Sequence, residues 1–250
     1  MSQALINAVD AQAGIICAVG AGGKKSLLYR LLDAHPGRIG LTASAMTAPP
    51  SQRRVDWRCI ASAEALAMQV PAAARDHRRL AFACPSDKPG RVSGLAVEQI
   101  ATLHERAQFN VTLVKADGAR MRGIKAPRAD EPLVVPGTQT VIYVVSAHVI
   151  GATLNAEVAH RPSLLSERLG LAEGERITAA HVGQLLAHPA VIHQNAGDAR
   201  VIALINQVDN DERRALARAA AEAAMHLAHA PSRVVLGAMS ATNPLVDIVD

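Results

Sequence analysis

Aromatic residues are scarce in this sequence. One Trp, two Tyr and two Phe stand among 250 residues, although half of all residues are hydrophobic. A core must therefore be built from Ala, Val, Leu and Ile, and few rings are available for nucleic-acid bases to stack on. The formal charge of +4, with basic and acidic residues interspersed, also falls short of a nucleic-acid-binding surface. We expect no nucleic-acid partner.

Cysteines and long apolar runs are also few. Cys17, Cys59 and Cys84 are odd in number and form no Cys-x-x-Cys pair, so neither a disulfide framework nor a thiolate zinc site is indicated. No apolar run approaches the roughly 18 to 20 residues that a membrane span needs, and no basic segment followed by an apolar one opens the chain. These features predict a soluble, cytoplasmic protein with no membrane partner.

The chain has the length of one α/β domain with a sizeable core, so we expect a single domain over residues 1–250. Short apolar runs of strand type alternate with helical patterns along it. A helical annex is expected at about 155–195, and a helix after Ser62 is expected to end before Pro71. Strands are expected at 14–19, 38–42, 58–61, 80–84, 111–115, 140–145, 201–205 and 233–237, and further helices at 27–32, 94–107 and 210–229. Residues 162–187 are expected to form two helices around Gly170 and Gly174, with Thr178 as the N-cap of the second.

A glycine-rich turn joins the first strand to the first helical pattern. Strand, glycine turn and helix in this order are typical of a phosphate-binding loop, because exposed backbone N–H groups, the helix N-terminus and a lysine all attract an anion. The expected phosphate-binding residues are Gly20, Ala21, Gly22, Gly23, Lys24, Lys25 and Ser26.

This loop departs from the Walker pattern Gly-x4-Gly-Lys-[Ser/Thr] in either register. If Gly23-Lys24 is the Gly-Lys pair, Ala18 and Lys25 replace the first glycine and the metal-binding hydroxyl. A Rossmann dinucleotide site fits less well, because its third glycine is replaced by Lys25 and the strand 38–42 ends without a carboxylate. On the loop alone, a turn that binds nothing stays an equal alternative.

The strand 111–115 leads into Asp117, the place of a Walker B carboxylate that holds Mg²⁺. An ordinary Asp-Gly turn is the alternative. Four positive charges follow between residues 120 and 128, where an anionic ligand would be bound. The expected catalytic residues are Lys24 and Asp117, the expected Mg²⁺ ligands are Ser26 and Asp117, and the expected anion-binding residues are Lys115, Arg120, Arg122 and Lys125.

The strand 201–205 ends in Asn206-Gln207-Val208-Asp209, which is similar to the guanine-reading Asn-Lys-x-Asp element of GTPases with Gln207 in place of Lys. The segment 238–241, Ala-Met-Ser-Ala, resembles their Ser-Ala loop. A polar turn leading into a helix is the alternative for the tetrapeptide. Asn206 and Asp209 are the expected purine-binding residues.

The order of these motifs resembles metallochaperone GTPases that assist nickel enzymes. A closer resemblance is to the YqeC family. It is carried by Gly20-Ala21-Gly22-Gly23-Lys24, Val92-Ser93-Gly94-Leu95, Ala116-Asp117-Gly118-Ala119-Arg120, Lys125-Ala126-Pro127, His160-Arg161-Pro162 and Asn206-x-x-Asp209. Family members are described as accessory proteins of selenium-dependent molybdenum hydroxylases. The resemblance implies an α/β, P-loop NTPase-like three-layer fold with a mainly parallel sheet and a small helical insertion, and a role in maturing a molybdenum enzyme.

Several positions depart from the usual family pattern. Lys25 stands for a threonine and Lys115 for a glutamate, and of a threonine run only Thr42, Ser44 and Thr47 remain. The two lysines place ammonium groups where Mg²⁺ needs oxygen ligands, and an adjacent cation opposes the metal electrostatically.

Three functions follow from these features. The first is a maturation factor that binds a purine nucleoside triphosphate, GTP or ATP, with slow hydrolysis left open. The second is a metal-independent carrier or scaffold for an anion, such as a nucleotide or the phosphate tail of a pterin cofactor. The third is a P-loop small-molecule kinase, which leaves Asn206 and Ser240 unused. Accessory nucleotide binding ranks first, and the base preference, the client enzyme and the oligomeric state stay open.

Overall fold

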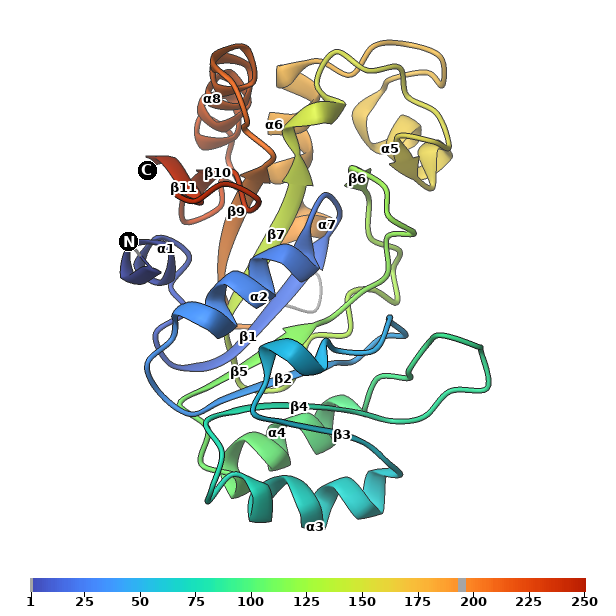
Figure 1. The fold of residues 1–250 in the computed structure, drawn as a ribbon. Coiled ribbons are helices and arrows are strands. Elements are labelled where there is room, and N and C mark those ends of the chain that lie inside the picture. Colours follow the sequence, from blue (N-terminus) through green and yellow to red (C-terminus); the bar gives the residue numbers. More distant parts are fainter. Residues whose placement is uncertain (1, 193–196) are drawn as a thin grey trace.

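A nine-stranded sheet forms the centre of the computed structural model, which describes residues 2–192 and 197–250. Its strands are β1 (Gly14–Gly20), β2 (Ile39–Ala43), β3 (Trp57–Ile60), β4 (Arg79–Ala83), β5 (Val111–Lys115), β7 (Thr138–Ser146), β9 (Arg200–Asn206), β10 (Val234–Gly237) and β11 (Leu245–Val249). The order in space is β11-β10-β9-β7-β1-β5-β2-β4-β3, and all neighbours are parallel except β10 and β11 (Figure 1). A two-stranded ribbon pairs β6 (Ile124–Lys125) with β8 (Ala159–His160).

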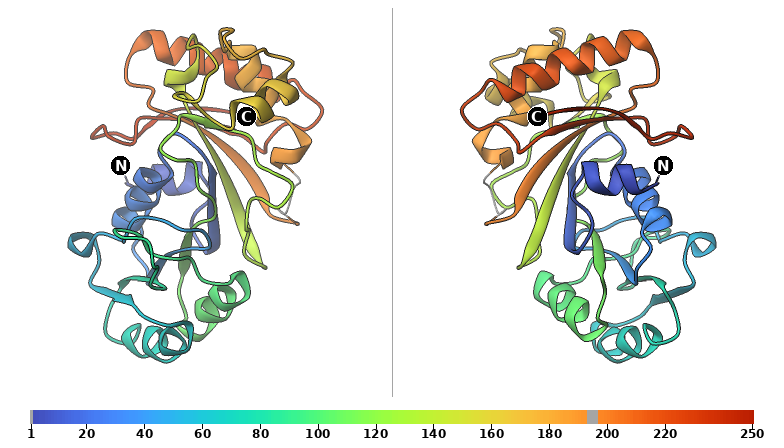
Figure 2. Two further views of the ribbon diagram at one scale, coloured as in Figure 1. Left: turned by 90° about the vertical axis from the view of Figure 1, so that its right-hand side faces the viewer. Right: turned by 90° about the vertical axis from the view of Figure 1, so that its left-hand side faces the viewer.

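Helices cover both faces of this sheet. They are α1 (Ser2–Ala8), α2 (Lys24–Ala34), α3 (Ala63–Ala73), α4 (Val97–Arg106), α5 (Pro162–Leu169), α6 (Ala179–Leu186), α7 (Pro189–Ile192) and α8 (Asp211–Met225), with 3₁₀ turns at Gln52–Arg54 and Ala147–Val149. Along β1, Ile16 and Ala18 join the core under α1 and α2, whereas Cys17 and Val19 join the opposite core, which includes α4 and α8. The side views show α1 and α2 on one side of the strands and α4 on the other (Figure 2). The expected α/β, P-loop NTPase-like fold with a mainly parallel sheet is confirmed.

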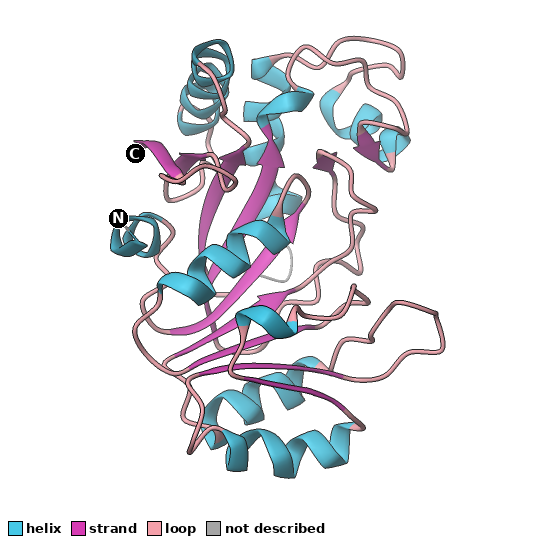
Figure 3. Ribbon diagram, in the orientation of Figure 1, coloured by secondary structure: helices cyan, strands magenta, loops and turns pink. Residues whose placement is uncertain are grey.

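The carboxyl ends of the parallel strands lie at one edge of the sheet, where their loops meet (Figure 3). Strand β1 is central, with β5 and β7 beside it and β2 and β9 one strand further out on either side. The glycine turn after β1 therefore lies next to Asp117 after β5, and Asn206 ends β9 on the other side. Ligands of open parallel sheets bind at this edge.

Two differences from the predicted helix boundaries have a clear structural reason. Helix α3 continues through Pro71, although the sequence predicted that it would end before this residue. The proline lies in the last turn of a helix that buries Leu66 and Val70, so this packing compensates for the missing hydrogen bond. Helix α4 begins only at Val97, because Leu95 N donates to Ala43 O and holds the preceding residues against the end of β2.

Some elements were not predicted. Helix α1, the antiparallel edge strand β11 and the β6–β8 ribbon carry too little periodicity in the sequence to be recognised. Helices α5, α6 and α7 lie in the region expected as a helical annex, and Thr178 caps α6 as its sequence suggested. Residues 193–195 of that region lie outside the described part of the chain. Among the described residues, no helix is long and apolar enough to cross a membrane.

Candidate phosphate-binding site

The glycine turn between β1 and α2 packs tightly against its neighbours. Gly22 and Gly23 have φ values of 82° and 121°, and a Cβ atom on them would lie 2.4 Å from Ser146 N and 2.2 Å from Asn206 Nδ2. Residues other than glycine are therefore excluded at both positions, because of the backbone conformation and because there is no room for a side chain. The turn brings the first residues of α2, whose N–H groups lack intrahelical acceptors, to the carboxyl edge of the sheet.

Part of the expected phosphate cradle is occupied by the protein itself. Gly20 N donates to Asp117 Oδ2 at 2.9 Å, Ala21 N to Val144 O at 2.8 Å, and Gly22 N to Arg122 O at 3.0 Å. The N–H groups that remain for an anion are those at the start of α2, from Gly23 to Ser26, together with the helix dipole.

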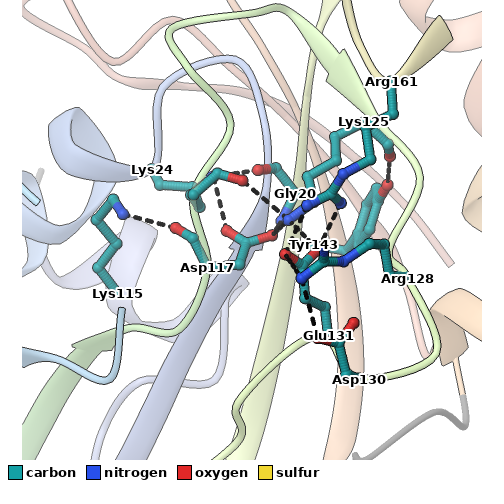
Figure 4. Close-up of polar contacts among 11 residues, drawn as sticks. Gly20, Lys24, Lys115, Asp117, Lys125, Arg128, Asp130, Glu131, Tyr143 and Arg161 are labelled. Carbon is teal, nitrogen blue, oxygen red and sulfur yellow. Dashed lines mark hydrogen bonds and ion pairs between the residues drawn. The ribbon is translucent and has the colours of Figure 1, made fainter. Parts of the chain in front are cut away.

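Asp117 is the centre of a buried charge cluster (Figure 4). Its Oδ1 lies 2.8 Å from Lys24 Nζ, an ion pair by distance in which the ammonium is not aligned for a hydrogen bond. Its Oδ2 accepts from Lys125 Nζ at 2.9 Å. Lys24 Nζ also donates to Gly20 O, so the loop lysine lies folded along its own turn. Burial lowers the pKa of Lys24, and the Asp117 charge opposes this shift.

Lys125 connects this cluster to a second carboxylate. Its Nζ lies 2.7 Å from Glu131 Oε2 and donates to Gly118 O at 2.9 Å, and its backbone carbonyl accepts from the Tyr143 hydroxyl. Arg161 donates two parallel hydrogen bonds to Glu131, of 2.7 and 2.8 Å. Burial by itself would raise the pKa of the Glu131 carboxyl. The hydrogen bonds and charges of Arg161 and Lys125 outweigh this effect and lower the pKa to about 2. Lys125, expected to bind an anionic ligand, is thus fully buried and paired with protein carboxylates.

A cleft of about 1150 Å³ opens above this cluster, at the carboxyl edge of the sheet. Seven lysine and arginine residues belong to its lining, and among the described residues no aspartate or glutamate does. The glycine turn contributes Gly22 and Gly23 to the wall. The seven cationic residues are Lys24, Lys25, Lys88, Arg91, Lys115, Arg120 and Arg122.

The crowding of positive charge contributes to a lower pKa at two lysines of the cleft. The pKa of Lys115 is lowered to about 8 by burial and by the nearby Lys24 charge. The pKa of Lys25 is lowered by burial and by Arg91. An anion placed among these side chains would relieve this repulsion, so the cleft is electrostatically suited to a ligand with several negative charges.

The residues expected to hold Mg²⁺ do not fit that ion. Two ammonium groups lie within 3 Å of the Asp117 carboxylate, Lys115 Nζ donates to Asp117 O at 2.6 Å, and Ser26 is exposed on α2. The described part of the chain also has no group of three or more His, Cys, Asp or Glu side chains that could hold a metal. Mg²⁺ needs near-octahedral oxygen coordination, and this position offers cations instead.

The expected purine-reading residues have protein partners. Asn206 Nδ2 donates to Gly22 O at 2.8 Å, and its Oδ1 accepts from Met239 N at 3.0 Å. Asp209 Oδ2 lies 3.4 Å from His148 Nε2 and 3.7 Å from Arg213 Nη1. Asn206 thus connects the glycine turn to the loop after β10, and neither residue is among those lining the cleft in the described chain.

Three hydroxyl residues lie at the end of β2 and in the loop that follows it, and of these only Thr47 lines the cleft in the described structure. Thr42 donates to Phe82 O and Ser44 to Leu133 O. Lys88 and Arg91 also line the cleft, and they were not predicted as site residues. The signal that could have identified them is the one applied to residues 120–128, namely positive charge directly after the carboxyl end of a strand.

The parallel sheet, the glycine-lysine turn between β1 and α2 and the aspartate after β5 define an α/β protein of the P-loop NTPase-like class. Within that class, the chain belongs to the YqeC family: residues 16–163 match the family model described as "YqeC protein". A curated relative from Escherichia coli (strain K12), described as "Uncharacterized protein YqeC", is 30% identical over 184 residues, which cover 72% of this chain and 70% of the relative.

Proposed function

We propose that this protein binds a phosphate-bearing ligand, a purine nucleotide or the phosphate part of a pterin cofactor, in the basic cleft without a metal ion. The observation that carries the proposal is the set of seven cationic residues and no carboxylate among the described residues that line the cleft. A metal-free nucleoside triphosphate carries several negative charges, which P-loop enzymes neutralise partly with Mg²⁺. Here Lys25 and Lys115 supply the counter-charge.

Hydrolysis is not part of this proposal. Phosphoryl transfer requires a group that orients the attacking nucleophile, in addition to charge neutralisation. No carboxylate lines the cleft in the described part of the chain, and Asp117 is engaged by Lys24 and Lys125. Two cleft residues of types that orient water have partners in the protein, since Gln207 accepts a hydrogen bond from Ser146 and His148 contacts Asp209. Binding is therefore the activity that the geometry supports best.

The first test is equilibrium binding of GTP, ATP and GDP, each measured with Mg²⁺ and with EDTA. We expect binding in EDTA at least as tight as with Mg²⁺, because the metal reduces the charge of the ligand that the cations attract. Binding that requires Mg²⁺ would contradict the proposal, and failure of all three nucleotides to bind would exclude a nucleotide as the ligand. Lys25→Thr provides a comparison, since it restores a hydroxyl at the position where the family usually has one.

A second prediction concerns Lys88 and Arg91, two exposed residues that bring positive charge to the cleft from the loop after β4. Replacing both by alanine should weaken GTP binding in EDTA about tenfold, with a shallower dependence on salt. The matched control replaces Arg75 and Arg106, exposed residues that follow α3 and end α4 at the opposite edge of the sheet. Equal losses in both double variants would show a non-specific effect of net charge.

A role in maturing a molybdenum hydroxylase is proposed from the family resemblance. It is tested by deleting the gene and measuring molybdenum hydroxylase activity in the cell extract. The intact gene should restore the lost activity, and the gene with Lys88 and Arg91 both replaced should restore less. Unchanged hydroxylase activity after deletion would separate the binding function from this role.

A further inference from the structure

We propose that the ligand carries a planar heteroaromatic ring, and that the edge of this ring enters an apolar pocket between α2 and the carboxyl ends of β2 and β4. This inference rests on the proposed function, because the ring must be joined to the phosphate bound in the cleft. A purine and a pterin share this chemistry, since each is a flat bicyclic nitrogen heterocycle.

The pocket adjoins the basic cleft. Lys25, Thr47, Ala48 and Lys115 line both spaces, so a ligand with its anionic part in the cleft reaches the pocket directly. The pocket is small, about 30 Å³, and therefore takes the edge of a ring while the rest lies in the cleft. Its inner wall is apolar and consists of Leu28, Tyr29, Leu41, Ala43, Pro50, Phe82 and Ala83, together with Thr42.

Tyr29 and Phe82 give this wall two of the five aromatic residues in the chain. The Tyr29 hydroxyl accepts a hydrogen bond from Ser51 N at 2.7 Å, which attaches the loop after β2 to helix α2. Lys25 Nζ lies 5.7 Å from the centre of the Tyr29 ring, so its charge is held at the junction of the two spaces. The site thus has an apolar wall beside a positive charge, as a ring attached to a phosphate requires.

The other side of the glycine turn is less suited to the ring. Asn206 uses its amide nitrogen on Gly22 O and its amide oxygen on Met239 N. The next residue, Gln207, accepts a hydrogen bond from the Ser146 hydroxyl, and Asp209 contacts His148 and Arg213. A base read by these side chains would have to displace contacts within the protein, whereas the apolar pocket is open to the cleft.

Recognition in this pocket depends on shape and apolar contact. The hydroxyl of Thr42 already donates to Phe82 O, so the wall offers little that distinguishes guanine from adenine. We therefore expect GTP and ATP to bind within about threefold of each other. The Asn206-x-x-Asp209 element, if it read the base, would instead favour guanine strongly.

The test narrows the pocket mouth by Ala48→Phe, a change at a half-buried loop residue that lines both spaces. The control is Ala119→Phe at a half-buried residue that lines the cleft alone. The probes are GTP, ATP and inorganic tripolyphosphate, which has the charge and no ring. We expect Ala48→Phe to weaken both nucleotides about tenfold and to leave tripolyphosphate within about twofold. Ala119→Phe should show no such difference between the probes.

Photolabelling of the unsubstituted protein with an azido derivative of ATP gives a second readout that does not depend on the folding of a variant. Labelled peptides from 25–29 or 41–50 support the pocket, whereas labels in 206–209 or 238–241 overturn it. An equal effect of Ala48→Phe on nucleotides and tripolyphosphate also overturns the inference of a ring pocket. The proposed function, binding of phosphate in the cleft, would not be contradicted by that result. If neither tripolyphosphate nor any nucleotide binds the parent protein, the proposed function itself fails and the inference fails with it.

Discussion

Replacing Asp117 by asparagine is expected to lower the free energy of unfolding by about 3–5 kcal/mol, the cost of leaving buried charges without their partner. Lys24 and Lys125 both lie within 3 Å of this carboxylate, and all three side chains are at most 5% exposed. Asparagine keeps the shape and an acceptor oxygen, but it removes the negative charge that makes two buried ammonium groups tolerable. Urea unfolding of the parent and the variant measures the difference.

The control for this experiment is Asp209→Asn, which removes a carboxylate that is 40% exposed and contacts His148 and Arg213. Exposed ion pairs contribute about 0–1 kcal/mol, so this variant should unfold close to the parent. A loss below about 1 kcal/mol for Asp117→Asn would mean that solvent reaches the cluster and that the charges are not buried together. The carboxylate would then be accessible to a metal, and the argument against Mg²⁺ would weaken.

Acid should destabilise the protein through Glu131. Arg161 and Lys125 lower the folded-state pKa of this carboxyl from 4.5 to about 2, against the effect of burial. Because the folded pKa is depressed, the stabilisation is complete above about pH 4.5 and is lost as the pH falls toward 2. The difference in pKa corresponds to about 3 kcal/mol of stability at neutral pH that Glu131→Gln would lack.

The measurement is urea unfolding of the parent protein and of Glu131→Gln between pH 6 and pH 2. The parent should lose its advantage over the variant within this window, so that the two free energies converge at the acid end. Glu105→Gln, at an exposed position of α4, serves as the control and should follow the parent throughout. A constant difference between parent and Glu131→Gln across the window would show that Glu131 is not held by a charge network.

Many elements were predictable because their signals are local. The apolar run at 14–19 is buried on both sides in β1, and the leucines at 27, 28, 31 and 32 form the buried face of α2. Ser62, Thr178 and Asn210 cap the helices that follow them through their own side chains. The strands β6 and β8 were missed because two residues are too few to show a periodic pattern.

The sequence predicted which loops carry site residues, but it did not predict which of these residues contact one another. Lys24, Asp117 and the basic segment after it were recognised from the type of residue and from their places after strands. The network around Lys125 was not, because its partner Glu131 also pairs with Arg161, 30 residues further along the chain, and these two meet only when the β6–β8 ribbon forms. The apolar pocket was not predicted either, since Tyr29 and Phe82 lie on α2 and β4 and adjoin only after the sheet is ordered.

By itself, the sequence determined the alternation of strands and helices, the glycine turn at the start of α2 and the positive charge of the loops. Backbone preferences and apolar periodicity act between near neighbours in the chain, so they can be recognised without a structure. The tertiary structure alone decided which charges face the cleft and which neutralise each other. That choice depends on the strand order, because β5 lies beside β1 and Asp117 after β5 therefore meets Lys24 at the start of α2, whereas Lys88 and Arg91 after β4 line the cleft.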